Sequence, residues 1–223
     1  MSDTIIFTVR PGGSLRGEIR VPGDKSISHR SIMLGSIAEG ITRVTGFLEA
    51  EDALATLKAF RAMGVEIEGP DEGNVTIHGV GLNGLKAPET LLYLGNSGTS
   101  MRLLSGLLAG QTFDSVLTGD ESLSKRPMRR VTLPLAEMSA QIVTEDDGTA
   151  PLAIAGTSAL TGIHYEMPIA SAQVKSCLLL AGLYAKGETT ITEPAPTRDH
   201  TERMLEGCGY PIERVGNKVS ITS

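Results

Sequence analysis

Apolar residues follow a helix, strand, helix pattern in the first third of the chain. The small and apolar run from Ser31 to Ala38 predicts a helix, and the β-branched run "ITRVTG" at 41–46 predicts a strand after it. A second, amphipathic helix is expected from Ala53 to Met63, with apolar residues at helical spacing. These are Leu54, Leu57, Phe60 and Met63. The runs "VEIEG" and "NVTIHG" then predict a closing pair of strands.

The same order returns twice further along the chain. Apolar helices are expected from Leu103 to Ala109 and from Ser176 to Ala185, followed by the strand-like runs "DSVLTG" and "ETTITE". When the three segments are aligned, cationic residues coincide at Arg30, Arg102 and Lys175, which are 72 and 73 residues apart. A recurrence of this length indicates a repeated supersecondary unit. We predict three βαβαββ units, at about 24–80, 95–156 and 170–223.

Units of this size cannot bury their apolar faces alone and should pack against one another. The most continuously apolar helix, "SCLLLAGLYA", belongs in the interior. We therefore expect an α/β (α+β) fold with the helices inside and the sheets outside. Two strand-like runs without a helix, "DTIIFTV" and "SLRGEIRV", precede the first unit. They predict an incomplete unit.

Each unit opens with a polar stretch that is suited to an anion. In "PGDKSISHR", Gly23 and Asp24 predict a turn, Ser26 or Ser28 a helix cap, and Lys25 and Arg30 lie near the positive end of the helix. The stretches "GNSGTSMR" and "SAQVK" repeat this arrangement. A single such helix start is more often a cap with a solvated charge, but repetition in register favours one convergent anion pocket.

Two more basic runs lie between a strand and a second helix. They are "SLSKRPMRR" at 122–130 and "TRDHTER" at 197–203. Lys125, Arg126 and Arg198 are expected to add grip on a phosphate or carboxylate, because guanidinium groups bind such anions through two parallel hydrogen bonds. Arg129, Arg130 and Arg203 are expected to face solvent.

Composition narrows the possible partners. The formal net charge is −6 and aromatic residues make up 4% of the chain, which argues against nucleic acid as a partner. The sequence contains neither an apolar run of 18 residues nor a secretory signal pattern at its start, so we expect no membrane partner and a cytoplasmic location. Cys177 and Cys208 lack metal-ligand spacing and are expected to be reduced packing residues, and no metal site is expected.

Five motifs in this order resemble those of the 5-enolpyruvylshikimate-3-phosphate synthase family, over essentially the whole chain. They are "PGDKSISHR", "LGNSGTSMR", "LTGDESLSKRPM", "SAQVKS" and "TRDHTE". The resemblance implies the enolpyruvyl transferase fold, an inverse α/β barrel with two domains of three βαβαββ units each. It also implies that residues 1–18 belong with a second domain, whereas residues 19–223 form a single domain.

The implied reaction transfers the enolpyruvyl group of phosphoenolpyruvate to the 5-hydroxyl of shikimate 3-phosphate and releases phosphate. It proceeds through a tetrahedral intermediate, with neither a metal nor an organic cofactor. Glyphosate is the implied inhibitor, and Gly98 matches the glycine of sensitive members. Ala172 stands where other members carry a second serine, and Arg198 is expected to compensate for the lost hydroxyl.

The resemblance also assigns residues to each substrate. Lys25 matches a catalytic lysine that meets both substrates. The shikimate 3-phosphate side matches Lys25, Ser26, Arg30, Ser171, Ala172, Gln173 and Arg198. The phosphoenolpyruvate side matches Lys25, Asn96, Gly98, Arg102, Arg126 and Gln173.

The family enzyme is roughly twice as long as this chain, and the remaining half carries its other acid-base groups, which must lie within hydrogen-bond reach of the transferred proton. The chain is therefore expected to be the N-terminal, substrate-binding half, which needs the C-terminal domain as partner and is inactive alone. Two alternatives remain open. One is half of the related transferase that acts on UDP-N-acetylglucosamine, and the other is a noncatalytic anion-binding module of the same fold.

Overall fold

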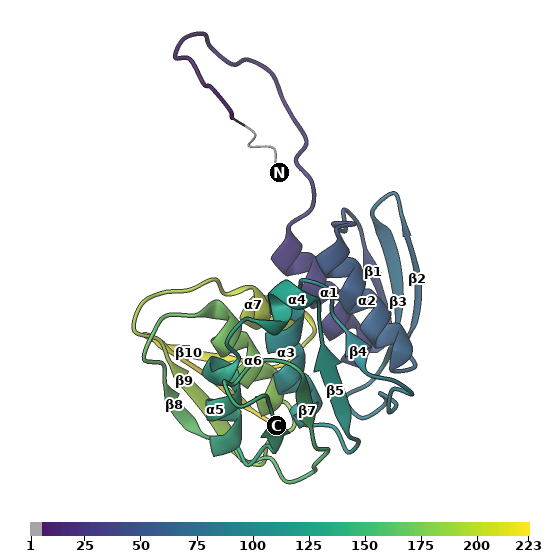
Figure 1. Cartoon of the computed structure of the whole chain (residues 1–223), viewed down its shortest axis with the longest axis vertical. Coiled ribbons are helices and arrows are strands. Elements are labelled where there is room, and N and C mark those ends of the chain that lie inside the picture. Colours follow the sequence, from purple (N-terminus) through teal and green to yellow (C-terminus); the bar gives the residue numbers. More distant parts are fainter. Residues whose placement is uncertain (1–5) are drawn as a thin grey trace.

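The computed structural model describes residues 6–223, which form three consecutive units of helices and strands (Figure 1). The first unit contains α1 (Lys25–Ile37), β1 (Glu39–Val44), α2 (Glu51–Ala62), β2 (Glu66–Asp71) and β3 (Asn74–Val80). The second contains β4 (Leu92–Tyr93), α3 (Gly98–Ala109), β5 (Ser115–Thr118), α4 (Glu121–Ser124), α5 (Arg129–Glu137), β6 (Ile142–Val143) and β7 (Leu152–Ile154). The third contains β8 (His164–Glu166), α6 (Ala172–Gly182), β9 (Glu188–Thr192), α7 (His200–Gly207), β10 (Glu213–Val215) and β11 (Lys218–Thr222).

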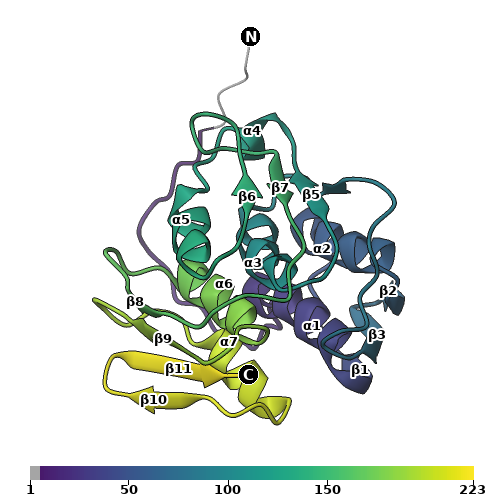
Figure 2. The same cartoon turned by 90° about the horizontal axis from the view of Figure 1, so that it is seen from below.

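Three separate sheets surround the helices α1, α3 and α6, as Figure 2 shows. The second and third sheets have the same strand order, β4-β5-β7-β6 and β8-β9-β11-β10. In both, the leading strand is parallel to its neighbour and the other pairs are antiparallel. This confirms the expected mixed α/β fold with helices inside and sheets outside. The leading strands β4 and β8 begin slightly before the unit starts expected at 95 and 170.

The first unit lacks a leading strand. Its sheet has the order β1-β3-β2, and residues 6–24 form an extended arm that leaves the body of the protein (Figure 1). The strand expected for "SLRGEIRV" is therefore wrong, because the arm has no neighbouring strand to supply backbone hydrogen bonds and Leu15 and Ile19 are fully exposed. The run "DTIIFTV" lies partly outside the described residues, and its described part, 6–9, forms no strand either.

The three inner helices form the core and are buried on nearly all sides. Every residue of α3 except Thr99 is buried, including four leucines at 0% exposure. Close approach of α3 and α6 requires a glycine, because a Cβ at Gly106 would lie 2.0 Å from the Cys177 carbonyl oxygen. Cys177 itself is a buried free thiol, as expected, whereas Cys208 is exposed. Among residues 6–223, no helix is long and apolar enough to span a bilayer.

One histidine lies in the middle of this core. His29, on α1, is completely buried, and its Nδ1 lies 2.7 Å from Thr56 Oγ1 on α2 and 3.3 Å from Ser100 Oγ on α3. Burial lowers the pKa of His29 to about 4, partly offset by the charge of Asp52. His29 is therefore neutral at pH 7 and serves as a hydrogen-bonding link between three helices.

The buried His29 should make the fold sensitive to acid. Its folded pKa is lower than its unfolded value of 6.5, so the unfolded state binds the extra proton between these two values and stability is lost as pH falls from 6.5 towards 4. Between pH 7.5 and pH 4.5 we expect a loss of roughly 2–3 kcal/mol from this residue. Urea unfolding of wild type and His29→Gln at both pH values measures it as the difference between their losses. Equal losses in the two proteins would contradict the assignment.

Candidate anion-binding site

Three helix N-termini meet at one cleft of about 270 Å³. The first two turns of α1 supply Lys25, Ser26 and Arg30. The first turn of α3 supplies Thr99, and the start of α6 supplies Ser171–Gln173. Arg198 and His200, from the segment between β9 and α7, complete the wall. All seven residues expected on the shikimate 3-phosphate side therefore lie around one cleft. Thr99 and His200 were not predicted, since a lone threonine or histidine carries no sequence signal for a pocket.

A side chain caps the N-terminus of each of the three helices α1, α3 and α6. Ser97 accepts a hydrogen bond from the Ser100 N–H, and Ser171 accepts one from the Val174 N–H. In α1 the expected cap was wrong, because Asp24 accepts from the Ile27 N–H instead of Ser26 or Ser28. Ser28 is used otherwise: its hydroxyl donates to the Asp24 carbonyl and accepts from the Leu48 N–H. Ser26 is thereby left free to face the cleft.

Arg30 lines the cleft, and three hydrogen bonds to other residues fix its guanidinium group in position. Its Nε donates to Thr201 Oγ1 at 2.6 Å and its Nη2 donates to Ser176 Oγ at 2.7 Å. Its Nη1 donates to the Ser26 carbonyl at 3.0 Å. These bonds use three of the five guanidinium N–H groups, so two are left over for a ligand. Arg198, by contrast, is exposed and reaches Ser26 Oγ at 3.2 Å.

A second basic cluster adjoins the cleft. Arg102 Nη1 donates to Gln173 Oε1 at 2.9 Å, and Gln173 Nε2 donates to Thr99 Oγ1 at 3.1 Å. Gln173 therefore belongs to both the cleft and the cluster. Arg126 bonds to the side chain and the carbonyl of Asn96. The residues expected on the phosphoenolpyruvate side thus gather next to the cleft.

Gly98 explains how the two guanidinium groups of this cluster come together. A Cβ at Gly98 would lie 3.0 Å from Arg102 Nη1 and 3.2 Å from Arg126 Nη1. The absent side chain thus leaves room for both guanidinium tips over the start of α3. Any methyl group at this position would crowd them.

The arginines of both groups lack negative partners. Within residues 6–223, no carboxylate lies within ion-pair distance of Arg30, Arg102, Arg126 or Arg198. Burial lowers the pKa of Arg30 to about 10, and burial followed by the charges of Arg130 and Arg126 lowers the pKa of Arg102. Both residues stay cationic at pH 7. A bound anion would offset the repulsion between the neighbouring guanidinium groups. The site is therefore suited to phosphate and carboxylate groups.

Lys25 differs from these arginines because it already has a partner. Its Nζ lies 2.9 Å from Asp52 Oδ2, and its side chain is 52% exposed. An exposed ion pair of this kind contributes little stability and is easily exchanged for another anion. Lys25 is therefore available to a ligand in the cleft.

Lys175 was expected to join Arg30 and Arg102, with which it aligns, at the anion pocket. This expectation was wrong. Lys175 is 1% exposed, and its Nζ lies 2.9 Å from Glu193 and 2.6 Å from Glu202. A buried ammonium group needs close carboxylates, which these two acids supply. Glu193 also accepts a hydrogen bond from Thr197, next to Arg198. Lys175 thus anchors the segment that carries Arg198. In the third unit it is Arg198, and not Lys175, that supplies a cation to the cleft.

The other basic residues lie at the surface. Lys125 was expected to contact the anion, but this was wrong. Its Nζ pairs with Glu121 at 2.6 Å and its side chain is 72% exposed, away from the cleft. Arg203 pairs with Asp199 at 2.7 Å on the exposed side of α7, in agreement with its expected solvent position. Arg129 and Arg130 are also exposed.

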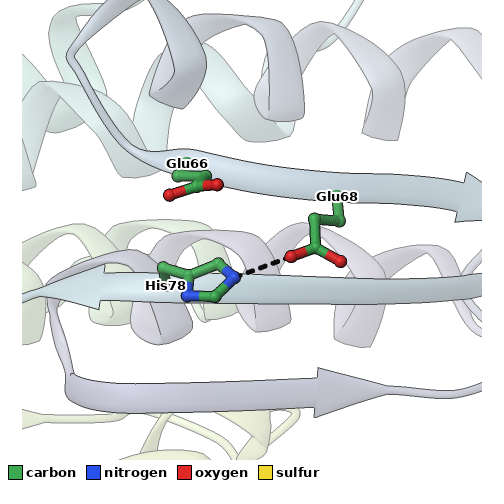
Figure 3. A group of neighbouring side chains, drawn as sticks. All are labelled: Glu66, Glu68 and His78. Carbon is green, nitrogen blue, oxygen red and sulfur yellow. Dashed lines mark hydrogen bonds and ion pairs between the residues drawn. The ribbon is translucent and has the colours of Figure 1, made fainter.

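A separate group of possible metal ligands lies on the first sheet. Glu66 and Glu68 on β2 and His78 on β3 have ligand atoms within 4.8 Å of one another, and His78 Nε2 lies 2.9 Å from Glu68 Oε1 (Figure 3). Both glutamates are exposed and His78 is half-buried. A cross-strand His–Glu pair on an exposed face accounts for this arrangement without an ion.

Removal of the Lys175 ammonium should destabilise the fold strongly. In Lys175→Met two buried carboxylates lose their counter-charge, and we expect the free energy of unfolding to fall by about 3–5 kcal/mol. Lys58 on α2 is exposed and gives a matched control, since Lys58→Met should change stability by less than about 0.5 kcal/mol. Urea unfolding at pH 7.5 measures both. Similar stabilities of the two variants would contradict the structural role of Lys175.

Comparisons with known proteins identify the family. The sequence profile of EPSP synthase (3-phosphoshikimate 1-carboxyvinyltransferase) matches residues 9–223. A 3-phosphoshikimate 1-carboxyvinyltransferase of Methylococcus capsulatus is 72% identical over 219 residues, which are 98% of this chain and 50% of the relative. One from Hydrogenovibrio crunogenus is 70% identical over 96% of this chain and 48% of its own length.

Solved structures agree with the sequence matches. An EPSP synthase structure from Acinetobacter baumannii superposes with a TM-score of 0.90 at 67% identity, over 92% of this chain and 46% of that one. This chain thus spans about half the length of the relatives that it matches. The chain belongs to the EPSP synthase (3-phosphoshikimate 1-carboxyvinyltransferase) family.

Proposed function

We propose that this chain is the substrate-binding half of an enzyme that transfers the carboxyvinyl group of phosphoenolpyruvate to shikimate 3-phosphate. The observation that carries the proposal is the gathering of all seven residues expected for shikimate 3-phosphate around one 270 Å³ cleft. The family membership of the chain and the names of its relatives support the same reaction.

Shikimate 3-phosphate is assigned to the cleft between α1, α6 and the Arg198 segment. Its phosphate is matched by Ser171 and Arg198, with the N-terminus of α6 behind them. Ser26 and Arg30 lie where they can hold the hydroxyl and carboxylate groups of the ring. The rigid support of Arg30 by Thr201 and Ser176 favours this role, because a pre-positioned guanidinium loses little freedom on binding.

Phosphoenolpyruvate is assigned to the adjoining cluster of Arg102 and Arg126. Among residues 6–223 neither arginine has a carboxylate partner. The absence of a side chain at Gly98 lets both guanidinium tips gather at the start of α3, where they can bind a small anion. The bridge from Arg102 through Gln173 to Thr99 joins the two subsites. The acceptor hydroxyl and the vinyl carbon would meet near this bridge, close to Lys25.

Lys25 is the proposed catalytic residue of this half. Its ammonium group lies at the mouth of the cleft and pairs with Asp52, so the anionic substrates compete for it. Acid-base catalysis of an addition and elimination needs groups on both sides of the reacting carbon. The second half of the enzyme would supply the others and, by closing over the cleft, would exclude water. The proposed reaction uses neither a metal nor an organic cofactor.

Binding of shikimate 3-phosphate to the isolated chain tests the proposal. We expect saturable calorimetric binding at low salt, weakened at least tenfold by Arg198→Ala, because a charge-assisted phosphate contact contributes about 1.5–3 kcal/mol. Arg43 is exposed on β1, away from the cleft, and Arg43→Ala is the matched control that should bind as wild type does. Equal loss in both variants, or no binding by a folded wild-type chain, would contradict the preformed subsite.

Combination of this chain with a C-terminal half from a relative discriminates among the candidate activities. We expect phosphate release that depends on both shikimate 3-phosphate and phosphoenolpyruvate, and none when Lys25→Ala replaces the wild-type chain. Turnover only with UDP-N-acetylglucosamine would favour the related transferase. A well-folded complex that binds both substrates without turnover would favour the noncatalytic module.

Glyphosate should inhibit the reconstituted enzyme. Because a Cβ at Gly98 would crowd Arg102 Nη1 and Arg126 Nη1, Gly98→Ala should narrow the space over α3 and raise the inhibitor concentration needed for half inhibition by about tenfold or more. Steady-state inhibition assays of both proteins measure it. Wild-type activity that resists millimolar glyphosate would contradict the assignment of this subsite.

A further inference from the structure

Asn96 determines where the guanidinium group of Arg126 lies. Arg126 Nη2 donates to Asn96 Oδ1, and Arg126 Nη1 donates to the Asn96 carbonyl at 3.3 Å. The same carbonyl accepts a hydrogen bond from the Gly98 N–H at 3.1 Å, at the start of α3. Arg126 has a longer contact with Ser122 Oγ, at 3.4 Å. Asn96 is itself exposed, so packing does not fix its side chain.

The contact with Arg126 depends on which way the Asn96 amide faces. The oxygen and the nitrogen of an asparagine side chain have nearly the same shape, so a rotation of about 180° exchanges them. Only the oxygen can accept a hydrogen bond from a guanidinium group. In the reversed orientation, the N–H groups of the amide and of the arginine would face one another. Arg126 therefore keeps its position only while Asn96 Oδ1 is turned towards it.

Asp120 fixes this orientation from the other side of the amide. Its two carboxylate oxygens lie 3.1 Å and 2.8 Å from Asn96 Nδ2. An ionised carboxylate only accepts hydrogen bonds, so it selects the NH₂ group and excludes the amide oxygen. The hydrogen bonds from Asn96 and then from the Leu123 N–H hold the pKa of the Asp120 carboxyl below its usual value. Asp120 is thus ionised at pH 7.

The backbone holds Asp120 in place for this contact. Asp120 Oδ1 accepts a hydrogen bond from the Leu123 N–H at 2.7 Å and caps α4. The N–H of Asp120 donates to the Gly95 carbonyl at 2.9 Å. Asp120 therefore joins the segment that carries Arg126 to the turn that carries Asn96.

A neutral amide between the acid and the guanidinium group leaves the cation available. Asp120 is not within ion-pair distance of Arg126, and neither is any other carboxylate among residues 6–223. A carboxylate in direct contact with Arg126 would compete with an anionic ligand for the same N–H groups. Through Asn96, Asp120 orients the guanidinium group without occupying it.

We propose that Asp120 is a positioning residue of the anion site, which holds the Asn96 amide in the one orientation that places Arg126 for a substrate. Asp120 acts through Asn96 and does not touch the substrate itself. The identity of that substrate as phosphoenolpyruvate rests on the proposed function. The selection of one amide orientation by Asp120 does not depend on it.

Two substitutions separate this role from the capping of α4. Asp120→Asn and Asp120→Ser both keep an oxygen that can cap the helix, because Asp, Asn and Ser are about equally good N-cap residues. Both variants should therefore unfold at nearly the same urea concentration as wild type. Neither fixes the amide of Asn96. The amide introduced by Asp120→Asn can either donate or accept, and the hydroxyl introduced by Asp120→Ser is too short to reach.

Asp114 offers a matched control in the same unit. It precedes β5 as Asp120 follows it, and its carboxylate accepts a hydrogen bond from the Gly156 N–H at 2.9 Å. Asp114→Asn removes the same charge and keeps an acceptor oxygen, but Asp114 has no contact with Asn96 or Arg126 among the hydrogen bonds of the described residues.

The first readout needs no substrate. Hydrogen bonds slow the rotation of a guanidinium group, so the ¹⁵N-labelled chain should show separate Nη signals for Arg126 in wild type and in Asp114→Asn. We expect these signals to broaden or merge in both Asp120 variants. Unchanged Arg126 signals in Asp120→Asn would overturn the proposal, whatever the substrate is.

The second readout is kinetic and uses the chain combined with a C-terminal half from a relative. We expect both Asp120 variants to raise KM for phosphoenolpyruvate about five- to tenfold, with kcat and KM for shikimate 3-phosphate changed by less than about twofold. An equal rise of both KM values, or an equal effect of Asp114→Asn, would indicate a general structural defect and would overturn the proposal. Absence of turnover by wild type would instead contradict the proposed function, and the guanidinium signals would then decide the role of Asp120.

Discussion

The packing of α1, α3 and α6 against one another is the interaction on which the rest of the structure depends. These helices are buried on nearly all sides, so their polar side chains and free backbone N–H groups emerge together at their N-terminal ends. The three sheets cover the outside and carry no part of the cleft. The position of the site is thus a consequence of how the core is built.

This arrangement concentrates positive charge that the chain leaves unbalanced. The net charge of the protein is −6, yet the four arginines at the cleft and the adjoining cluster have no carboxylate partner among the described residues. By contrast, the buried Lys175 is neutralised by two glutamates. The cations at the helix ends therefore remain available to a ligand. The buried Lys175 instead anchors the segment that bears Arg198.

Much of this could be predicted from the sequence, because local pattern governs it. The amphipathic period of α2, the apolar runs of α3 and α6 and the repeat of three units were clear, and the quoted motifs led to seven of the nine residues that line the cleft. The fate of Lys175 could not be predicted from its alignment with Arg30 and Arg102. It depends on Glu193 and Glu202, which lie 18 and 27 residues further along the chain.

Other features of the fold could not be predicted, because the local sequence carries little information about them. The strands β4, β6 and β8 have two or three residues each, too few to show a period of two. Asp24 caps α1 although two serines follow it, a choice that depends on the use of Ser28 to tie α1 to Leu48. The arm shows strand-like alternation, but a strand exists only where a partner edge is present.

We propose that this chain carries a preformed anion-binding subsite at the common end of three helices. Amide chemical-shift mapping of the ¹⁵N-labelled chain with shikimate 3-phosphate tests it most directly. We expect shifts confined to the first turns of α1, α3 and α6 and to the segment around Arg198, with the sheets unchanged. Shifts spread over the sheets, or a well-dispersed spectrum that does not change at saturating ligand, would contradict it.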